Sequence, residues 1–383
     1  MNFGTSRASA IEKLNNFVEQ NLFEYSRLRN FDYGPNNRSN ISCLSPYITH
    51  GVVSELEIIK KSLNKFSFSK NEKFIQEVLW RTYWKGWLEL RPAVWTDYLN
   101  ELKKIREEFK DNSNYKNAIE GKTNIDCFNE WIKELKENNY LHNHTRMLFA
   151  SIWIFTLGLP WQKGAEFFMK HLFDGDSASN TLSWRWVAGI QTKGKHYLAQ
   201  SWNITKFTNN KYKNIKVNEN ALPIKDKREY KISPLQTNEN FNLNEQLIVF
   251  ENEINLDFVE LKKYKRIYYV LLSNNARSIQ LDHKVLEYKR KILDLKLAKN
   301  QNGEKLLDEN TLEDVLKESE SFDIIYPSIG ENYSFLKQLI KKYDLKVNFI
   351  KRKEDKFCWN FSNKGYFNFK SNIPIILSNF NLN

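Results

Sequence analysis

The sequence predicts a chain of two parts, an all-helical region followed by a smaller, Rossmann-like α/β domain with a mainly parallel sheet. Three observations lead to this fold class: helical spacing of apolar residues over 8–204, an Asn- and Lys-rich stretch at 205–244, and alternating strand-like and helix-like segments beyond it. We therefore predict a helical domain at 1–204, a linker at 205–244 and an α/β domain at 245–383.

The first region is predicted to be helical because apolar residues recur every three or four positions. Ala10, Leu14 and Phe17 share one face of a helix. Pro46 follows a serine at a plausible helix start, and Pro160 closes a long apolar run. No alternating strand pattern competes in this region, which therefore reads as helices joined by loops.

The second region alternates between two kinds of segment. Short apolar runs, EQLIVF, RIYYVLL, FDIIYP and LKVNFI, are separated by the helical stretches LDHKVLEYKRKILDL and SFLKQLIKKY. This alternation is typical of an α/β domain with parallel strands. The preceding linker contains Pro223 and Pro234 and little apolar periodicity.

Composition favours a polyanionic partner. Lys and Arg number 58 against 46 Asp and Glu, which gives a net charge of +12. The summed field should attract nucleic acid, although Lys-rich helices also serve simply to keep a surface solvated. The chain contains 11 Trp, more than a helical core needs, which indicates stacking surfaces or redox stations beside ordinary core packing.

Cysteine count and hydropathy predict a soluble, cytoplasmic protein, and we expect a monomer. Cys43, Cys127 and Cys358 are odd in number and far apart, which argues against a disulfide framework and fits a reducing compartment. The N-terminus has no apolar signal segment. The longest apolar run, 147–161, is shorter than the roughly 20 residues of a membrane span.

One segment, 141–186, places polar residues within an apolar helical background. Its polar members are Asn143, Arg146, Asp174, Asp176 and Asn180. Buried charges need partners, so the arginine and the two aspartates are expected either to form a structural ion pair or to hold a polar ligand. The residues alone leave both readings open.

Several ordered motifs resemble the photolyase/cryptochrome family. LHNHTRM, PW, FFMKHLFDGDSASN and WRW follow one another between 141 and 186, like the family's MHNR-x-RM, DWR, FM-x-x-L-x-DGD-x-A-x-N and WQW. Upstream, SCLSPYITHG and QEVLWRTYW resemble two further family segments. The resemblance covers about 8–204 and implies a helical domain that holds FAD in a folded, U-shaped conformation.

The resemblance also implies which residues contact the cofactor. These are Tyr25, Ser42, Ser45, Arg81, Asn143, Arg146, Asp174, Asp176 and Asn180. The tyrosine and the two serines would lie at the diphosphate, the Arg146 and Asp174 pair beside the flavin ring with Asp176 completing the polar wall, and Asn180 at flavin N5. One departure weakens the phosphate contacts, because the family's Thr appears here as Ile41.

Five further positions correspond to those that contact a flipped-out cyclobutane pyrimidine dimer in the family. They are Glu77, Trp80, Asn143, Met147 and Trp186. Aromatic and thioether groups stack on pyrimidine rings, while a carboxyl group and an amide bind the base edges of a lesion extruded from DNA. Any one of these residues alone is as readily explained by core packing. Together they imply UV-damaged DNA as the partner.

The family's chain of tryptophans, which re-reduces the flavin, is only partly present. Trp184 and Trp161 match its proximal and middle members, whereas Ala118 stands where the outer member is expected. Trp131 and Trp153 are the alternative exits for the electron path.

Other features of the resemblance are altered. The α/β domain that usually precedes the helical domain is not found there, and we interpret 245–383 as a transposed, antenna-like domain, the alternative being an unrelated appended domain. A second chromophore is not identified. His142 and His144 point to different faces of a helix with no third ligand apparent, so we predict no metal site.

The sequence therefore predicts a light-driven DNA repair lyase that splits pyrimidine dimers with FAD. A cryptochrome-like photoreceptor is the main alternative, favoured by the missing outer tryptophan and opposed by the retained dimer-contacting residues. A flavin-free scaffold would require Arg146, Asp174 and Asp176 to be purely structural. A (6-4) photolyase is disfavoured because Asn143 follows His142 where that chemistry uses paired histidines.

Overall fold

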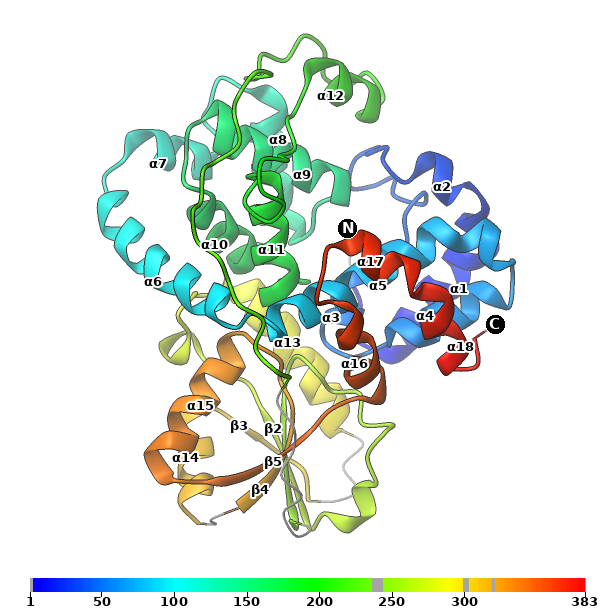
Figure 1. Ribbon diagram of the computed structural model, residues 1–383, viewed down its shortest axis with the longest axis vertical. Coiled ribbons are helices and arrows are strands. Elements are labelled where there is room, and N and C mark those ends of the chain that lie inside the picture. Colours follow the sequence, from blue (N-terminus) through cyan, green and yellow to red (C-terminus); the bar gives the residue numbers. More distant parts are fainter. Residues whose placement is uncertain (1–2, 236–243, 299–302, 319–320, 383) are drawn as a thin grey trace.

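A computed structural model describes residues 3–235, 244–298, 303–318 and 321–382 of the chain. Its helical part and its sheet part lie one above the other in Figure 1. The elements of the first part are α1 (Arg7–Gln20), η1 (Leu22–Glu24), α2 (Tyr25–Leu28), α3 (Ser45–Thr49), α4 (Glu55–Leu63), α5 (Phe68–Glu89), α6 (Ala93–Glu108), α7 (Ser113–Glu120), α8 (Asp126–Asn138), α9 (Asn143–Ser151), the π-helical turn η2 (Ile152–Thr156), α10 (Trp161–His171), α11 (Ser177–Val187) and α12 (Ser201–Phe207).

The helical region confirms the predicted periodicity. Helix α1 buries Ala10, Leu14, Phe17 and Val18 on one face, and Ser6 caps its start by accepting a hydrogen bond from the backbone of Ser9. The longest helix, α5, is central because α2, α4 and α11 all pack against it. Its position brings residues of the predicted site from several helices into one neighbourhood.

The second part contains a five-stranded sheet whose neighbouring strands pair in parallel, as predicted. The strands are β1 (Gln246–Phe250), β2 (Arg266–Val270), β3 (Lys305–Leu307), β4 (Ser321–Ile325) and β5 (Lys346–Ile350), in the order β3-β2-β1-β4-β5. Helices α13 (His283–Leu297), α14 (Glu309–Lys317) and α15 (Glu331–Tyr343) and the 3-10 turns η3 (Leu261–Lys263) and η4 (Asn274–Ala276) connect them. The sequence did not reveal β3, because three residues are too few to show a period.

The chain returns to the helical part after β5. The elements α16 (Lys353–Cys358), η5 (Trp359–Phe361), α17 (Tyr366–Ser371) and α18 (Ile373–Asn379) follow the last strand, and α16, η5 and α17 pack against α5. A Cβ atom on Gly86 would lie 2.6 Å from Trp359 Cδ1, so this contact requires glycine. Residues 353–382 therefore lie with the helices, which differs from the predicted domain 245–383.

The predicted linker lies along the helical part for most of its described length (Figure 1). Ile224 N donates to Ala188 O at 2.9 Å, and Ser233 N donates to Leu90 O at 2.8 Å. Helix α12 extends across the predicted boundary at residue 204. Residues 236–243 of the linker lie outside the described residues. The segment 208–235 is thus a strap on the helices rather than a free connection.

None of the helices in the described ranges is both long and apolar enough to cross a bilayer. Cys43, Cys127 and Cys358 are all buried free thiols.

Candidate functional site

Asp174 is the centre of the predicted polar wall. It lies between α10 and α11 with a side chain that is 3% exposed. Its Oδ2 accepts hydrogen bonds from Ser45 Oγ at 2.5 Å and from Arg146 Nη2 at 2.9 Å. Arg146 Nε also donates to Leu141 O, and its guanidinium lies 5.0 Å from the ring centre of Tyr140. The predicted ion pair is therefore present and joins α3, α9 and the loop before α11.

The turn that precedes α3 has the backbone of an anion cradle. Cys43 is buried with φ 50°, in the left-handed region that a β-carbon disfavours, and Leu44 follows at φ −92° and ψ −10°. Successive residues of opposite hand turn their N–H groups to one side. Ser42, partly buried, lies at the start of this turn and Ser45 at its end. This geometry supports the predicted place of the diphosphate.

Tyr25, the third predicted diphosphate contact, lies in an aromatic cluster. Its ring centre is 5.8 Å from that of Phe17 and 5.2 Å from that of Phe74, both nearly edge to face. Burial, together with the nearby carboxylate of Glu77, raises the pKa of Tyr25 well above its ordinary value, so the phenol stays protonated and remains a hydrogen-bond donor.

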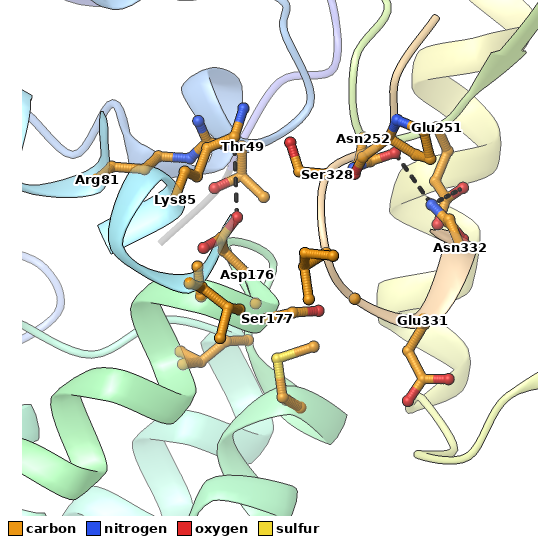
Figure 2. Close-up of a pocket in the computed structure, with 18 of the residues that line it drawn as sticks. Thr49, Arg81, Lys85, Asp176, Ser177, Glu251, Asn252, Ser328, Glu331 and Asn332 are labelled. Atoms are coloured by element: carbon orange, nitrogen blue, oxygen red, sulfur yellow. Dashed lines mark hydrogen bonds and ion pairs between the residues drawn. The ribbon is translucent and has the colours of Figure 1, made fainter. Parts of the chain in front are cut away.

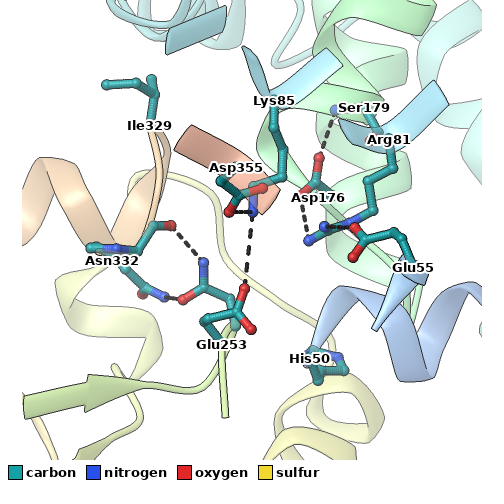
Figure 3. A network of polar contacts seen from close by, with 12 residues as sticks. His50, Glu55, Arg81, Lys85, Asp176, Ser179, Glu253, Ile329, Asn332 and Asp355 are labelled. Atoms are coloured by element: carbon teal, nitrogen blue, oxygen red, sulfur yellow. Dashed lines mark hydrogen bonds and ion pairs between the residues drawn. The ribbon is translucent and has the colours of Figure 1, made fainter. Parts of the chain in front are cut away.

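Asp176 and Arg81 are tied to each other rather than to Asp174. Asp176 caps α11 by accepting from Ser179 N at 2.7 Å, and its other oxygen lies 3.4 Å from Arg81 Nη2. Arg81 also donates to Glu55 at 3.0 Å, a residue that the sequence did not single out. Figure 3 shows this group beside a second set of charges, which includes Lys85, Glu253 and Asp355.

That second set holds the two parts of the chain together. Arg352 bonds both Glu55 and Asp355 at 3.0 Å, and Lys85 lies 3.3 Å from Asp355 and 4.0 Å from Glu253. Although burial opposes ionisation, the cations Arg352 and Arg81 lower the pKa of Glu55 to about 2. Sequence spacing gives no signal for this cluster, because its members come from α4, α5, α16 and the loop after β1.

Several buried polar atoms in the predicted FAD region have no hydrogen-bond partner among the described residues. They are Asp174 Oδ1, Arg81 Nε, Ser179 Oγ, Thr181 Oγ1 and Trp184 Nε1. Atoms of this kind also occur elsewhere in the described residues, and in this region they include donors and one carboxylate acceptor between 174 and 184 and on α5. Asn180, 9% exposed, donates to Ala165 O at 2.8 Å. These residues suit a polar ligand of mixed hydrogen-bonding character, which is what FAD is.

The five predicted dimer-contacting residues come from three helices that meet. Glu77 and Trp80 lie on α5, Asn143 and Met147 lie one turn apart on α9, and Trp186 lies on α11. Helix α11 packs against both α5 and α9. Asn143 is exposed and the other four are partly buried, so all five lie at the surface of this helical junction.

Both tryptophans of this group stack on other aromatic rings. Trp186 stacks on Tyr197, with ring centres 5.8 Å apart. Trp80 stacks on Tyr366 of α17 at 3.3 Å, with an angle of 10° between the rings. Glu77 lies 3.8 Å from Arg29 Nε, and burial raises the pKa of its carboxyl group. Sequence reasoning did not predict Tyr366 here, because α17 is far from α5 along the chain.

The aromatic contacts of Trp184 lead toward Trp153. These two rings are 6.2 Å apart, and Trp153 is 5.9 Å from Tyr115, a partly exposed residue on α7. Ala118, where the outer tryptophan is expected, is fully buried on the same helix. Of the two exits suggested by the sequence, Trp153 rather than Trp131 has its ring beside that of Trp184 in the described residues.

Trp161 and Trp131 have different neighbours. Trp161 stacks on Tyr98 at 5.4 Å, and Tyr98 contacts Trp95, which bonds Ser334 of α15. The three rings of this branch are buried, and the branch ends at α15 of the sheet part. The ring of Trp131 lies beside that of Tyr212, with ring centres 6.2 Å apart.

A second polar region lies at the carboxyl end of the sheet, beside α11 (Figure 2). Glu251 bonds Arg277 at 2.7 Å and Asn332 at 2.9 Å, and Lys289 lies 3.7 Å from it. A pocket of about 50 Å³ lies between these residues and α11, and it is also lined by the predicted cofactor residues Arg81 and Asp176. Gly330, at the end of this crevice, would clash with Ser177 if it carried a Cβ atom.

The two histidines of the H-x-H motif have structural partners. His142 caps α9 by accepting from His144 N at 3.1 Å, and His144 Nε2 lies 2.9 Å from Asn203 Oδ1. Burial lowers the pKa of both imidazoles, to about 4 for His142. Within the described ranges, no three His, Cys, Asp or Glu side chains are grouped to hold a metal ion.

Comparison with known proteins agrees with these local features. Residues 74–218 match the family described as FAD binding domain of DNA photolyase. The chain is 34% identical over 152 residues to a deoxyribodipyrimidine photo-lyase of Streptomyces griseus, covering 39% of this chain and 32% of that protein. It is 27% identical over 201 residues to the photo-lyase of Vibrio cholerae, covering 51% and 41%.

Among solved structures, the chain is similar to a bacterial class III photolyase from Agrobacterium tumefaciens. The two are 26% identical with a TM-score of 0.45, and the match covers 53% of this chain and 42% of the other. The chain thus spans about a third to two fifths of the length of these curated relatives.

Proposed function

We propose that this chain, whose residues 74–218 belong to the FAD-binding family of DNA photolyases, is a light-driven repair flavoprotein that splits cyclobutane pyrimidine dimers. The observation that carries the proposal is the buried wall of Ser45, Asp174 and Arg146 beside a group of orphan polar atoms. A polar ligand that completes these hydrogen bonds would remove the cost of leaving buried polar atoms unpaired.

In this proposal the chain's own residues hold and orient the cofactor. The turn 42–45 binds the diphosphate through backbone N–H groups and the Ser42 hydroxyl, while the Ser45 hydroxyl donates to Asp174 at the edge of this turn. Arg146 and Asp174 border the flavin ring, and Asn180 is held toward it by its bond to Ala165. The chemistry that FAD supplies when bound is transfer of one electron to the dimer, whose two cyclobutane carbon–carbon bonds break before the electron returns.

The dimer would enter at the junction of α5, α9 and α11. Trp80 and Trp186 offer aromatic faces for the two pyrimidine rings, Met147 offers a polarisable side chain, and Glu77 and Asn143 offer hydrogen-bonding groups for the base edges. Extruding a base costs a few kcal/mol, and least at a damaged site. The net charge of +12 favours the phosphate backbone, so binding should weaken with salt.

A repair assay on a defined thymine dimer tests this function directly. Purified protein loaded with FAD and a reductant should restore the dimer to two thymines under blue light and not in the dark. Met147→Ala, at a partly buried position on α9 that is assigned to the dimer and not to the cofactor, should lower affinity for the dimer while flavin content stays constant. Binding of FAD with equal affinity for damaged and undamaged DNA would instead favour a photoreceptor. Protein that stays colourless after FAD loading would exclude both.

We also propose that the sheet domain is a transposed counterpart of the α/β domain that precedes the helices in this family. The strand order β3-β2-β1-β4-β5 and the return of 353–382 to the helical part support it. A rearranged chain in which residues 244–382 precede residue 3 should then fold and retain FAD as the natural order does. Loss of FAD from a folded rearranged chain would argue for an unrelated appended domain.

A further inference from the structure

Tyr366 lies on Trp80 as a base would lie on an aromatic platform. The two ring centres are 3.3 Å apart and the planes differ by 10°, whereas the next shortest ring separation in the described residues, Phe173 to Tyr288, is 4.3 Å. This is face-to-face overlap, the arrangement by which proteins stack nucleic-acid bases on aromatic side chains. The phenol also donates to Gln76 O at 2.8 Å, much as the edge of a base would.

The segment that carries Tyr366 is lightly anchored. Helix α17 has six residues, of which only Phe369 is buried, and its neighbour Phe367 is 86% exposed. Further contacts with α5 are those of the Tyr83 ring with Tyr366 at 5.3 Å and with Phe369 at 5.5 Å, and a bond from Tyr83 Oη to Lys364 O at 3.1 Å. An ion pair of Lys370 with Glu72 at 3.4 Å joins side chains that are about 35% and 42% exposed. Exposed ion pairs of this kind contribute little to stability.

The elements on either side of α17 are held much more firmly. Before it, Arg352, which precedes α16, and Asp355 of α16 belong to the buried charge cluster, and Trp359 of η5 is 1% exposed. After it, α18 buries Ile373 and Ile376. Segments with few buried contacts open locally at low free energy, while well-packed ones open only with the whole protein. Residues 363–371 can therefore lift from α5 between two fixed points.

We propose that Tyr366 occupies, in the DNA-free protein, the stacking position on Trp80 that an extruded pyrimidine takes, and that residues 363–371 move aside when the lesion enters. The inference rests on the proposed function, because it assigns Trp80 to the lesion pocket. A ligand that must displace an internal occupant binds with an affinity reduced by the fraction of protein that is open. Tyr366 thereby selects for bases that are already easy to extrude.

Three variants and two DNA duplexes test this inference in the dark. Tyr366→Ala removes the occupant, Tyr366→Phe keeps the ring but loses the bond to Gln76, and Phe367→Ser is the matched control on the exposed side of α17. Affinity for dimer-containing and undamaged duplex is measured by fluorescence anisotropy, and thermal denaturation checks folding. We expect Tyr366→Ala to bind the dimer duplex on the order of tenfold more tightly, Tyr366→Phe less so, and Phe367→Ser unchanged.

Hydrogen exchange gives a second readout that does not depend on flavin. Amides of 363–371 should exchange faster than those of 373–379 in the free protein, and faster still with the dimer duplex but not with the undamaged one. Weaker dimer binding by folded Tyr366→Ala, or greater protection of 363–371 in the complex, would make Tyr366 part of the pocket wall and overturn the inference.

The two proposals fail in different ways. If the unaltered protein binds both duplexes equally, the proposed function fails, and the exchange rates of 363–371 and 373–379 in the free protein still report on the occupant. Equal rates in these two segments would overturn local opening. If the unaltered protein prefers the dimer duplex but Tyr366→Ala does not bind it more tightly, only the inference about Tyr366 fails.

Discussion

The polar residues around Asp174 and those around Glu251 lie on two sides of the start of α11, and they differ in one respect. Around Asp174, one carboxylate oxygen and several neighbouring donors lack partners within the described residues. In Glu251, by contrast, both carboxylate oxygens are bonded, one by Arg277 and one by Asn332, and Lys289 lies near them, although Asn332 Oδ1 has no partner among the described residues. A carboxylate with an unbonded buried oxygen marks a candidate ligand site, whereas one with both oxygens bonded marks a structural joint.

The largest expected effect is at Asp174. Asp174→Ala removes the acceptor for Ser45 and leaves Arg146 without its carboxylate, a loss of about 3 to 5 kcal/mol for a buried pair. Affinity for FAD should fall by more than about 100-fold, measured by fluorescence titration of the apoprotein. Asp174→Asn, which still accepts from Ser45, should lose less. Unchanged FAD affinity in Asp174→Ala would remove the distinction between the two regions.

The matching change in the other region should affect stability and leave FAD binding intact. Arg277→Met leaves Glu251, 2% exposed, with only part of its positive surroundings, and should lower the free energy of unfolding by about 3 kcal/mol in urea. Arg290→Met, on the exposed face of α13, is the control and should change it by less than about 0.5 kcal/mol. A loss of FAD in folded Arg277→Met would show that the sheet crevice contributes to the cofactor site.

The joint between α5 and the loop after β4 should depend on pH. Glu89 accepts from Tyr326 Oη at 2.7 Å and Ile329 N at 2.8 Å, and burial raises its pKa from 4.5 to about 7. Between these two pH values the unfolded chain ionises Glu89 while the folded protein keeps it neutral, so this residue's contribution to stability is full below pH 4.5 and is lost as pH rises toward 7.

The change Glu89→Gln should therefore remove a fall in unfolding free energy of up to about 3 kcal/mol across that interval. Its amide can still accept from Ile329 N and donate to Tyr326 Oη. Urea titrations at several pH values check this expectation. Parallel pH profiles for the variant and the unaltered protein would mean that Glu89 has the same pKa in both states.

The smallest effect concerns the supply of electrons rather than either polar region. If the path from Trp184 runs through Trp153 to Tyr115, then Trp153→Phe and Tyr115→Phe should slow light-driven reduction of the protein by an added thiol more than Trp161→Phe does. The rate of flavin bleaching is the measurement, and FAD content should be equal in all three variants. A larger effect of Trp161→Phe would favour the buried branch through Tyr98.

Much of the site could be predicted from local sequence. The Asp174 and Arg146 pair and four of the strands follow from motifs or periodicity that span a few residues. The sequence did not predict that Tyr366 lies on Trp80, that Arg352 lies beside Glu55, or that Trp153 rather than Trp131 contacts Trp184. These contacts join distant parts of the chain, and periodicity carries no information about which distant segments meet.

The sequence by itself thus determined the order of helices and strands and the residue types of the polar wall around Asp174, because capping, helical spacing and short motifs act within one or two turns of the chain. Only the tertiary structure decided that 353–382 leaves the sheet and returns to α5. That return depends on the fit of Trp359 against Gly86 and on the pairing of Arg352 with Glu55, which exist only once both parts are folded together.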